Sequence, residues 1–169
     1  MKIAFTGTHG TGKSTDVFTL AREMKIDHPG KHIRVYVDGA SESPFPKNQK
    51  ATVTNQLWVF TNQMNKELTI YNGTRCDILI TDRTICDCIA YSIYAGHKEL
   101  AEYQYGMAKF YIPTYERIIL KTIANNNFLM NDGVRDHEDE KFRKGIEDIL
   151  YTTYQRMQKE GIQVNLEVR

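Results

Sequence analysis

The most constraining feature of the chain is a glycine-rich turn near its start. It reads Gly7-Thr8-His9-Gly10-Thr11-Gly12-Lys13-Ser14. An apolar stretch, 2–6, precedes the turn, and a segment of helical character, 13–25, follows it. In such a turn the glycines let backbone N–H groups converge on phosphate oxygens, and the positive N-terminus of the helix adds to the attraction. The order of strand, turn and helix therefore predicts a phosphate-binding loop within an α/β sheet.

The turn also fits the pattern G-x-x-x-x-G-K-[ST], which is typical of loops that bind nucleoside triphosphates. In this pattern Lys13 reaches the β- and γ-phosphates, and the Ser14 hydroxyl is a ligand of Mg²⁺. The residues expected to bind the nucleotide are Gly7, Thr8, His9, Gly10, Thr11, Gly12, Lys13, Ser14 and Thr15. His9 occupies an unspecified position of the pattern, so we assign it no chemistry.

Around the loop, short β-type segments alternate with helical ones. The expected strands are 2–6, 32–37, 77–81, 118–120 and 162–168. The expected helices are 13–25, 51–71, 84–94, 100–111 and 138–159. This alternation predicts a parallel sheet covered by helices on both faces, which is a three-layer α/β fold. No linker or repeat interrupts it, so residues 1–169 are expected to form a single domain.

Composition narrows the class of protein. The formal net charge is +1, so no global positive field favours tight nucleic-acid binding, although a local basic groove is compatible with it. No apolar run approaches the length of a membrane span, and we expect no membrane partner. Three cysteines, Cys76, Cys86 and Cys88, form a sparse and odd set that suits a reducing compartment. We therefore expect a cytoplasmic protein, or one in the host cytoplasm if a phage encodes it.

The end of the third expected strand separates the classes of enzyme that share this loop. A GTPase carries an Asn-Lys-x-Asp guanine reader, and the sequence has none. A remodelling ATPase ends its third strand in Asp-Glu, but here the strand ends in Thr81-Asp82-Arg83. Asp82 is placed to hold the Mg²⁺ shell, directly or through water, and Arg83 to face the transferred phosphate. The alternative is that Asp82 caps the next helix and Arg83 is solvated.

The second expected strand ends at a candidate for the acceptor site. Parallel strands deliver their following loops to one side of a sheet, so Asp38 is expected near the phosphate loop. A carboxylate there can accept or orient the proton of an acceptor hydroxyl. Glu42 is a second acid in the same stretch. The alternative is that Asp38 only forms a turn beside Gly39.

A lid over the transferred phosphate requires mobile backbone and a cation. The stretch Gly133-Val134-Arg135, inside an expected lid at about 123–137, has both. Arg135 is the first candidate for an arginine that stabilises the transferred group, and Arg143 is the second. The alternative for Arg135 is an ordinary exposed loop arginine.

Three polar residues of the middle helices are candidates for contact with a sugar or base. Asp87 follows Arg83 by one turn, and Gln56 and Gln63 are seven apart, on one helix face. The alternative for each is an ordinary helix residue. The aromatic residues of the same helices have the spacing of core positions.

These stretches resemble the P-loop nucleoside and nucleotide kinases, a group that includes thymidylate kinases and deoxynucleoside kinases. The similarity extends to the small P-loop kinases of archaeal and phage genomes. Beside the loop, the stretches that carry it are DGASESPFP, QLWVFTNQMNKEL, TDRTICDCIAYSIYAGH and NDGVRDHEDEKFR. The resemblance implies a five-stranded parallel sheet, ATP as the donor and a nucleoside-type acceptor. In these kinases an arginine closely follows the acid at the position of Asp38; here the chain reads Asp38-Gly39-Ala40-Ser41, which weakens the case for a monophosphate acceptor.

The resulting hypothesis is an ATP- and Mg²⁺-dependent kinase that transfers the γ-phosphate to a nucleoside or nucleotide, with Lys13, Asp38, Arg83 and Arg135 as catalytic residues. One alternative follows from the phage enzymes that the chain resembles. They phosphorylate the hydroxymethyl group of modified pyrimidines, such as 5-hydroxymethyluracil, in DNA. Another alternative is a non-catalytic ATP-binding protein. A homodimer is compatible with each of them.

Overall fold

A computed structural model of the chain describes residues 1–37, 39–46, 52–73, 75–125 and 140–169. Its centre is a five-stranded sheet in which every pairing is parallel and the order is β2-β3-β1-β4-β5. The strands are β1 (Lys2–Thr6), β2 (Ile33–Tyr36), β3 (Ile78–Asp82), β4 (Arg117–Leu120) and β5 (Leu166–Val168). The expected five-stranded parallel sheet is therefore confirmed.

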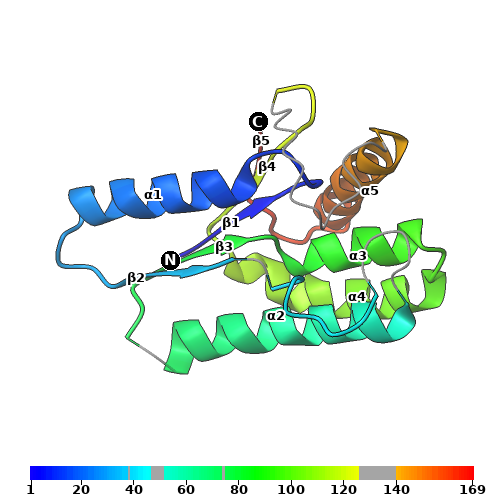
Figure 1. Ribbon diagram of the computed structural model, residues 1–169, viewed down its shortest axis with the longest axis horizontal. Helices are drawn as coiled ribbons and strands as arrows, with labels where there is room; N and C mark the ends of the chain where they lie inside the picture. Colours follow the sequence, from blue (N-terminus) through cyan, green and yellow to red (C-terminus); the bar gives the residue numbers. More distant parts are fainter. Residues whose placement is uncertain (38, 47–51, 74, 126–139) are drawn as a thin grey trace.

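Helices connect the strands and cover both faces of the sheet. They are α1 (Lys13–Asp27), α2 (Val53–Gly73), α3 (Ile85–Tyr94), α4 (Lys98–Tyr111) and α5 (Glu140–Lys159), with a 3₁₀ turn η2 (Ile112–Thr114) after α4. Figure 1 shows α1 on one face of the sheet and α2, α3 and α4 on the opposite face. This is the expected three-layer arrangement.

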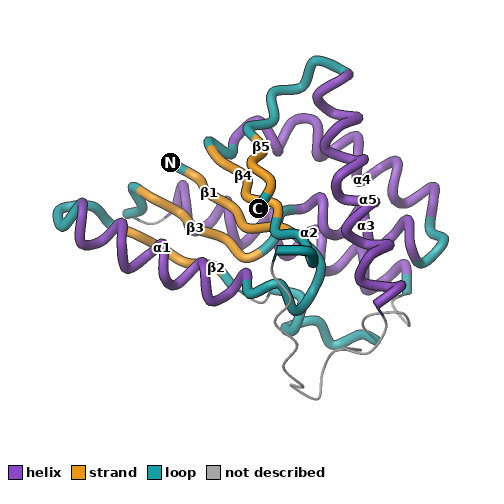
Figure 2. Tube along the Cα trace, turned by 90° about the horizontal axis from the view of Figure 1, so that it is seen from above, coloured by secondary structure: helices purple, strands orange, loops and turns teal. Residues whose placement is uncertain are grey.

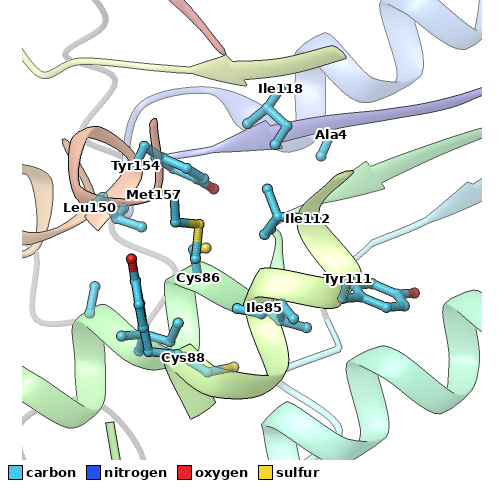
Figure 3. Close-up of a cluster of buried hydrophobic side chains, with 14 of the residues drawn as sticks. Ala4, Ile85, Cys86, Cys88, Tyr111, Ile112, Ile118, Leu150, Tyr154 and Met157 are labelled. Carbon is cyan, nitrogen blue, oxygen red and sulfur yellow. The ribbon is translucent and has the colours of Figure 1, made fainter. Parts of the chain in front are cut away.

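The alternation of side chains along β1 explains the layers. Ile3 and Phe5 point to the face covered by α1, where they form a buried cluster with Val17. Ala4 points to the other face, into a larger cluster that includes Ile85 of α3 and Tyr154 of α5. Figure 3 shows that residues of α3, α5 and η2 meet there beneath β1 and β4. Because β1 is buried on both faces, all five of its residues are inaccessible to solvent.

The last strand is shorter than the sequence pattern predicts. Only Leu166–Val168 pair with β4, whereas the expected strand began at residue 162. The Ile162 amide instead donates to the Met157 carbonyl at the end of α5, so this part of the chain closes the helix. Since β4 itself has four residues, it offers no room for a longer partner.

The sheet order places the site. The direction of chain progression reverses at β1, which lies between β3 and β4. In parallel α/β sheets, ligands bind beyond the carboxyl ends of the strands at this reversal point. Figure 2 shows β1, β3 and β4 running side by side toward the loops that follow them. Those loops are the glycine-rich turn after β1, Arg83 after β3 and Lys121 after β4.

Candidate functional site

The glycine-rich turn has a backbone that needs its glycines. Gly7, Gly10 and Gly12 all have positive φ, at 135°, 70° and 75°. At Gly7 an added Cβ would also lie 2.5 Å from the carbonyl oxygen of Lys121, so the loop after β4 closes directly on the turn. Gly12 caps α1 without any side-chain hydrogen bond to the first turn. The first N–H groups of α1 therefore have no side-chain cap, which suits an anion.

Lys13 lies across the turn. Its side chain is buried, and Nζ donates to the Thr8 carbonyl at 2.6 Å and to Thr11 Oγ1 at 3.5 Å. Thr11 in turn donates from Oγ1 to the Thr8 carbonyl at 2.9 Å. The ammonium group is thus held within the loop, at the position where the motif places it against phosphate oxygens.

Ser14 and Asp82 come together as expected for a metal pair. The Ser14 hydroxyl donates to Asp82 Oδ2 in a short hydrogen bond. The other oxygen, Asp82 Oδ1, is buried and has no hydrogen-bond partner among the described residues. A hydroxyl and a carboxylate oxygen are ligands that Mg²⁺ takes, and it keeps water and substrate phosphate for its remaining positions. The two residues fit Mg²⁺, and Asp82 Oδ1 is the atom that needs a partner.

Arg83 has a strained backbone and a side chain that contacts neighbouring residues. Its φ is 83°, in the left-handed region that is unfavourable for residues other than glycine. The carbonyl accepts hydrogen bonds from Thr81 Oγ1 at 3.0 Å and from Gln63 Nε2 at 3.4 Å. Its guanidinium lies 3.7 Å from Asp87 Oδ1 and 5.4 Å from the centre of the Tyr91 ring. The strain and these contacts fix both ends of Arg83 at the carboxyl end of β3.

Asp87 forms part of the scaffold. It closes a capping box at the start of α3 by accepting from the Thr84 amide at 2.8 Å, and it also accepts from Thr6 Oγ1 at 2.7 Å. Burial raises the pKa of the Asp87 carboxyl, while Arg83 opposes that rise. Asp87 therefore ties the ends of β1 and β3 together and holds Arg83, where the sequence suggested contact with a sugar or base.

An arginine of α5 reaches the phosphate loop. Arg143 is buried, and its Nε donates to the His9 carbonyl at 3.2 Å. The neighbouring Phe142 ring lies 5.6 Å from the His9 ring and 4.8 Å from that of Tyr94 on α3. Burial lowers the pKa of Arg143, because a charge is costly in that setting. Of the two expected arginines, Arg143 is therefore in the site, whereas Arg135 lies outside the described residues, as does most of the expected lid at 123–137.

The acceptor side is described in part. Asp38 lies outside the described residues. Its neighbour Gly39 packs so closely on β2 that an added Cβ would lie 2.1 Å from the Tyr36 hydroxyl and 3.2 Å from Gln63 Oε1. Glu42, the second candidate acid, is half exposed and lies 3.7 Å from Lys66 Nζ on α2. The segment after β2 is therefore packed against α2, with Gln63 at the contact.

A buried polar network lies behind this contact, and no local pattern in the sequence predicts it. Glu67 Oε1 accepts from Gln63 Nε2 at 2.6 Å, and Oε2 accepts from the hydroxyls of Tyr115 at 2.6 Å and Tyr111 at 3.0 Å. Lys2 Nζ lies 3.2 Å from the same carboxylate and above both tyrosine rings. The Gln63 amide group is thereby oriented, with Nε2 on Glu67 and Oε1 toward Gly39.

Comparison with known proteins agrees with this geometry. Residues 2–169 match a family described as an AAA domain. The chain belongs to the AAA-domain family. No curated protein matches the sequence significantly. No helix in the described part of this AAA domain is long and apolar enough to span a membrane.

Solved structures with the same fold are kinases and a NadR protein. A thymidylate kinase from Ehrlichia chaffeensis is 18% identical with a TM-score of 0.70, over 100% of this chain and 91% of that one. A deoxyadenosine kinase from M. mycoides is 16% identical with a TM-score of 0.61, over 100% and 89% of the two chains. A NadR protein in complex with NR is 16% identical with a TM-score of 0.71, and the match spans 99% of this chain but only 45% of that protein. The expected P-loop kinase fold is therefore confirmed.

Proposed function

We propose that this protein is an ATP- and Mg²⁺-dependent phosphotransferase that acts on the hydroxyl of a nucleoside or nucleotide. The observation that carries the proposal is the Ser14–Asp82 hydrogen bond, which joins the phosphate loop to the end of β3 and leaves Asp82 Oδ1 unsatisfied. Arg83, and not a second acid, follows Asp82. The chain therefore has an arginine at the position where a remodelling ATPase has a carboxylate that activates water, which supports transfer to an acceptor hydroxyl.

Each side chain has a role that requires positioning and charge neutralisation more than covalent chemistry. Lys13 and the N-terminus of α1 bind the β- and γ-phosphates. Ser14 and Asp82 would hold Mg²⁺, which neutralises phosphate charge when bound. Arg83, Arg135 and Arg143 are the proposed cations around the transferred group, and the whole chain is proposed to work as one domain with a lid at about 123–137.

Asp38 is the proposed acceptor-side residue, as the acid that orients the attacking hydroxyl. The packing of Gly39 on Tyr36 and Gln63 supports this role, because it ties the residue next to Asp38 to the sheet and to α2. The closeness of thymidylate and deoxyadenosine kinases in fold supports a nucleoside-type acceptor. The missing arginine after Asp38 favours a nucleoside over a monophosphate.

The experiment offers γ-labelled ATP with free nucleosides, with nucleoside monophosphates and with DNA that contains 5-hydroxymethyluracil. We expect label in a nucleoside, and loss of transfer in Lys13→Ala. Lys159→Ala is the matched control, because Lys159 is an exposed lysine at the end of α5. ATP binding without transfer to any acceptor would leave a non-catalytic ATP-binding protein as the function.

One observation favours the second candidate, a kinase that modifies pyrimidines in DNA. A groove of about 470 Å³ lies between α1 and the edge strand β2. Its apolar part consists of Ala21, Ile33 and Val35, and its basic part of Arg22, Lys25, Lys31, His32 and Arg34. Basic side chains in a groove are suited to binding the phosphates of nucleic acid. The near-neutral net charge of the chain does not predict such a local basic groove.

The groove also leads to the acceptor side. β2 lies at the edge of the sheet and runs from this groove toward residue 38, so a strand bound along it would approach the acceptor site. The exposed Arg22 and Arg34 make no ion pair among the described residues, while Lys31 lies 3.6 Å from Asp77. For this second function we expect the Arg22→Glu, Arg34→Glu double variant to lose transfer to DNA and to retain ATP binding. If the variant transferred phosphate to DNA as well as the wild type does, the groove would be excluded as the DNA-binding site.

A further inference from the structure

The backbone of Arg83 is held in its left-handed conformation by three other residues. The Arg83 amide donates to the Phe5 carbonyl of β1 at 2.7 Å. The Arg83 carbonyl accepts from Thr81 Oγ1 of β3 and from Gln63 Nε2 of α2. Of these three partners, Gln63 is the one that a helix contributes. A large residue with positive φ persists only where its surroundings impose that conformation, so these contacts determine how Arg83 leaves the sheet.

The Gln63 amide group is fixed in one orientation. Its Nε2 atom has two hydrogens, and it donates to Glu67 Oε1 at 2.6 Å and to the Arg83 carbonyl at 3.4 Å. Because a carboxylate and a carbonyl only accept hydrogen bonds, a flipped amide would place its own oxygen against them. A Cβ added to Gly39 would lie 3.2 Å from Gln63 Oε1, so the other side of the amide is also closely packed. The amide is therefore a rigid link between α2 and Arg83.

Glu67 is in turn held by buried partners. Its side chain is completely buried, and its carboxylate accepts from the hydroxyls of Tyr111 and Tyr115 and pairs with Lys2. Burial and the nearby carboxylate raise the pKa of both tyrosines, so their hydroxyls keep the hydrogens that they donate. An apolar replacement of a buried ion pair is often neutral or stabilising. This pair, however, lies one hydrogen bond from Gln63, and it orients the Gln63 amide as an apolar core would not.

The two ends of Arg83 are thus fixed by different groups. Gln63 holds its backbone, and its guanidinium lies beside Asp87 and Tyr91. The Arg83 side chain is 16% exposed and that of Asp87 only 2%, so a ligand can reach the cation but not its carboxylate partner. We propose that Gln63 and Glu67 are positioning residues, which act through Arg83 on the transferred phosphate. This inference rests on the proposed phosphotransferase function, in which Arg83 is a cation at that group.

Gln63→Met tests the link, because methionine has a similar length and no N–H donor. We expect kcat to fall at least about tenfold with little change in the KM for ATP, since a small displacement of a catalytic group affects transfer most. Gln104→Met is the matched control, because Gln104 is also buried and its Nε2 donates to the Gln56 carbonyl at 3.3 Å. It should retain the kcat of the wild type. An equal loss in both variants would show that the role of Gln63 is only structural.

A double-mutant cycle separates an effect through Arg83 from a direct effect of Gln63. Arg83→Ala removes the guanidinium, so Gln63→Met made in that background should lower kcat no further. Circular dichroism of the four proteins checks that each is folded. Losses of kcat that multiply in the double variant would show that Gln63 acts independently of Arg83, and they would overturn the proposal.

Two double variants test the role of Glu67. Both contain Lys2→Met, so neither leaves a buried ammonium without its carboxylate. The variant with Glu67→Gln keeps an oxygen that can accept from Gln63 Nε2, whereas the variant with Glu67→Leu does not. We expect the first to retain kcat within about threefold and the second to lose at least about tenfold. The same kcat in both would show that Glu67 does not position Gln63.

A spectroscopic measurement tests the position of Arg83 without activity. In a proton–nitrogen correlation spectrum of the arginine Nε–H groups, the Arg83 signal is the one lost in Arg83→Lys. We expect Gln63→Met to shift or broaden this signal and Gln104→Met to leave it in place. If the wild type transferred phosphate to no acceptor, the proposed function would fail, and this spectrum would still decide whether Gln63 positions Arg83. An Arg83 signal unchanged by Gln63→Met would overturn the proposal.

Discussion

The Arg143 guanidinium donates from Nε to the carbonyl of His9 at 3.2 Å, which joins the first turn of α5 to the middle of the phosphate loop. The two residues are 134 positions apart in the sequence. A buried cation thereby lies beside the anion site, at the start of the helix that follows residues 126–139.

Loss of the Arg143 guanidinium should lower the rate of phosphate transfer more than it lowers the affinity for ATP. An arginine at the transferred group contributes about 10³-fold or more to phosphoryl transfer. We expect Arg143→Ala to lower kcat by at least about 100-fold, and Arg143→Lys to recover only a small part, because lysine lacks the planar pair of donors. Steady-state kinetics with ATP measure this. Arg156→Ala is the control on the exposed side of the same helix, and an equal loss there would indicate a stability effect.

The unsatisfied oxygen of Asp82 predicts a dependence on metal concentration. Asp82→Asn keeps the size of the side chain but removes the charge that favours a divalent cation. We expect the Mg²⁺ concentration for half-maximal activity to rise at least about tenfold, while binding of metal-free nucleotide is unchanged or tighter. Titration of activity with Mg²⁺ and calorimetry with nucleotide in chelator measure the two. An unchanged Mg²⁺ dependence would show that Asp82 does not help to bind the metal.

Gly7 should tolerate no side chain. A Cβ there would lie 2.5 Å from the Lys121 carbonyl, and the backbone has a φ of 135°. We expect Gly7→Ala to lower the free energy of unfolding by about 1–3 kcal/mol from backbone strain alone and to weaken ATP binding. Gly30→Ala is the control, since its Cβ would meet no atom of the described residues within 4 Å and its φ is not positive. Urea unfolding and nucleotide titration of both variants make the comparison.

The sequence was sufficient for the fold and for the phosphate loop for a physical reason. Strand–helix alternation and the loop motif are local patterns, and they predict the parallel sheet and the phosphate loop. The Ser14–Asp82 pair joins residues 68 positions apart, and it was predicted because both residues follow parallel strands whose carboxyl ends meet at one edge of the sheet. Ends of strands were less predictable, as for β5, because pairing depends on the length of the partner β4. Arg143 was only the second candidate for the arginine near the transferred group, because its contact with the His9 carbonyl joins residues 134 positions apart and no local pattern predicts it.

The buried network around Glu67 could not be predicted, because its members are far apart. Lys2, Gln63 and Tyr115 are each on different elements, and in the sequence Glu67 looks like an ordinary charged helix residue. Gln63 stood out as a candidate to read a base by its spacing from Gln56. In the fold its amide nitrogen donates to Glu67 and to the Arg83 carbonyl, so it links the network to the strained residue after β3.

Removal of one member of the Lys2–Glu67 pair should cost more than removal of both. Burial lowers the pKa of Lys2, and Glu67 opposes this shift, so each charge depends on the other. Glu67→Leu leaves a buried ammonium, and we expect about 3–5 kcal/mol loss in the free energy of unfolding. Lys2→Met should be similar, and the double variant should recover part of the loss. Denaturant unfolding of the wild type, the two single variants and the double variant yields the coupling energy. Strictly additive losses in the free energy of unfolding would contradict an interaction between Lys2 and Glu67.

The three thiols should differ in reactivity with pH. Burial raises the pKa of Cys88 to about 12, and burial also raises the pKa of Cys86 and of the half-buried Cys76. Because the thiolate is the reactive form, iodoacetamide at pH 8 should modify Cys76 slowly and leave Cys86 and Cys88 intact until the protein unfolds. Mass spectrometry of native and urea-treated protein counts the modified sites. Rapid modification of Cys86 or Cys88 in the native state would contradict their burial.

The same shifts fix the direction in which stability depends on pH. The folded protein keeps a proton on Cys88 up to about pH 12, whereas the unfolded chain loses it near the ordinary value of about 8.5. Between these values the native state binds more protons, so the free energy of unfolding should fall as pH rises. Below pH 8 this contribution is fully present and constant. Unfolding in urea at pH 7.5, 9 and 10 for the wild type and for Cys88→Ala measures the difference. The variant should show a shallower decline above pH 9, since its alanine has no proton to lose, and an equally steep decline in both would assign the loss to other groups.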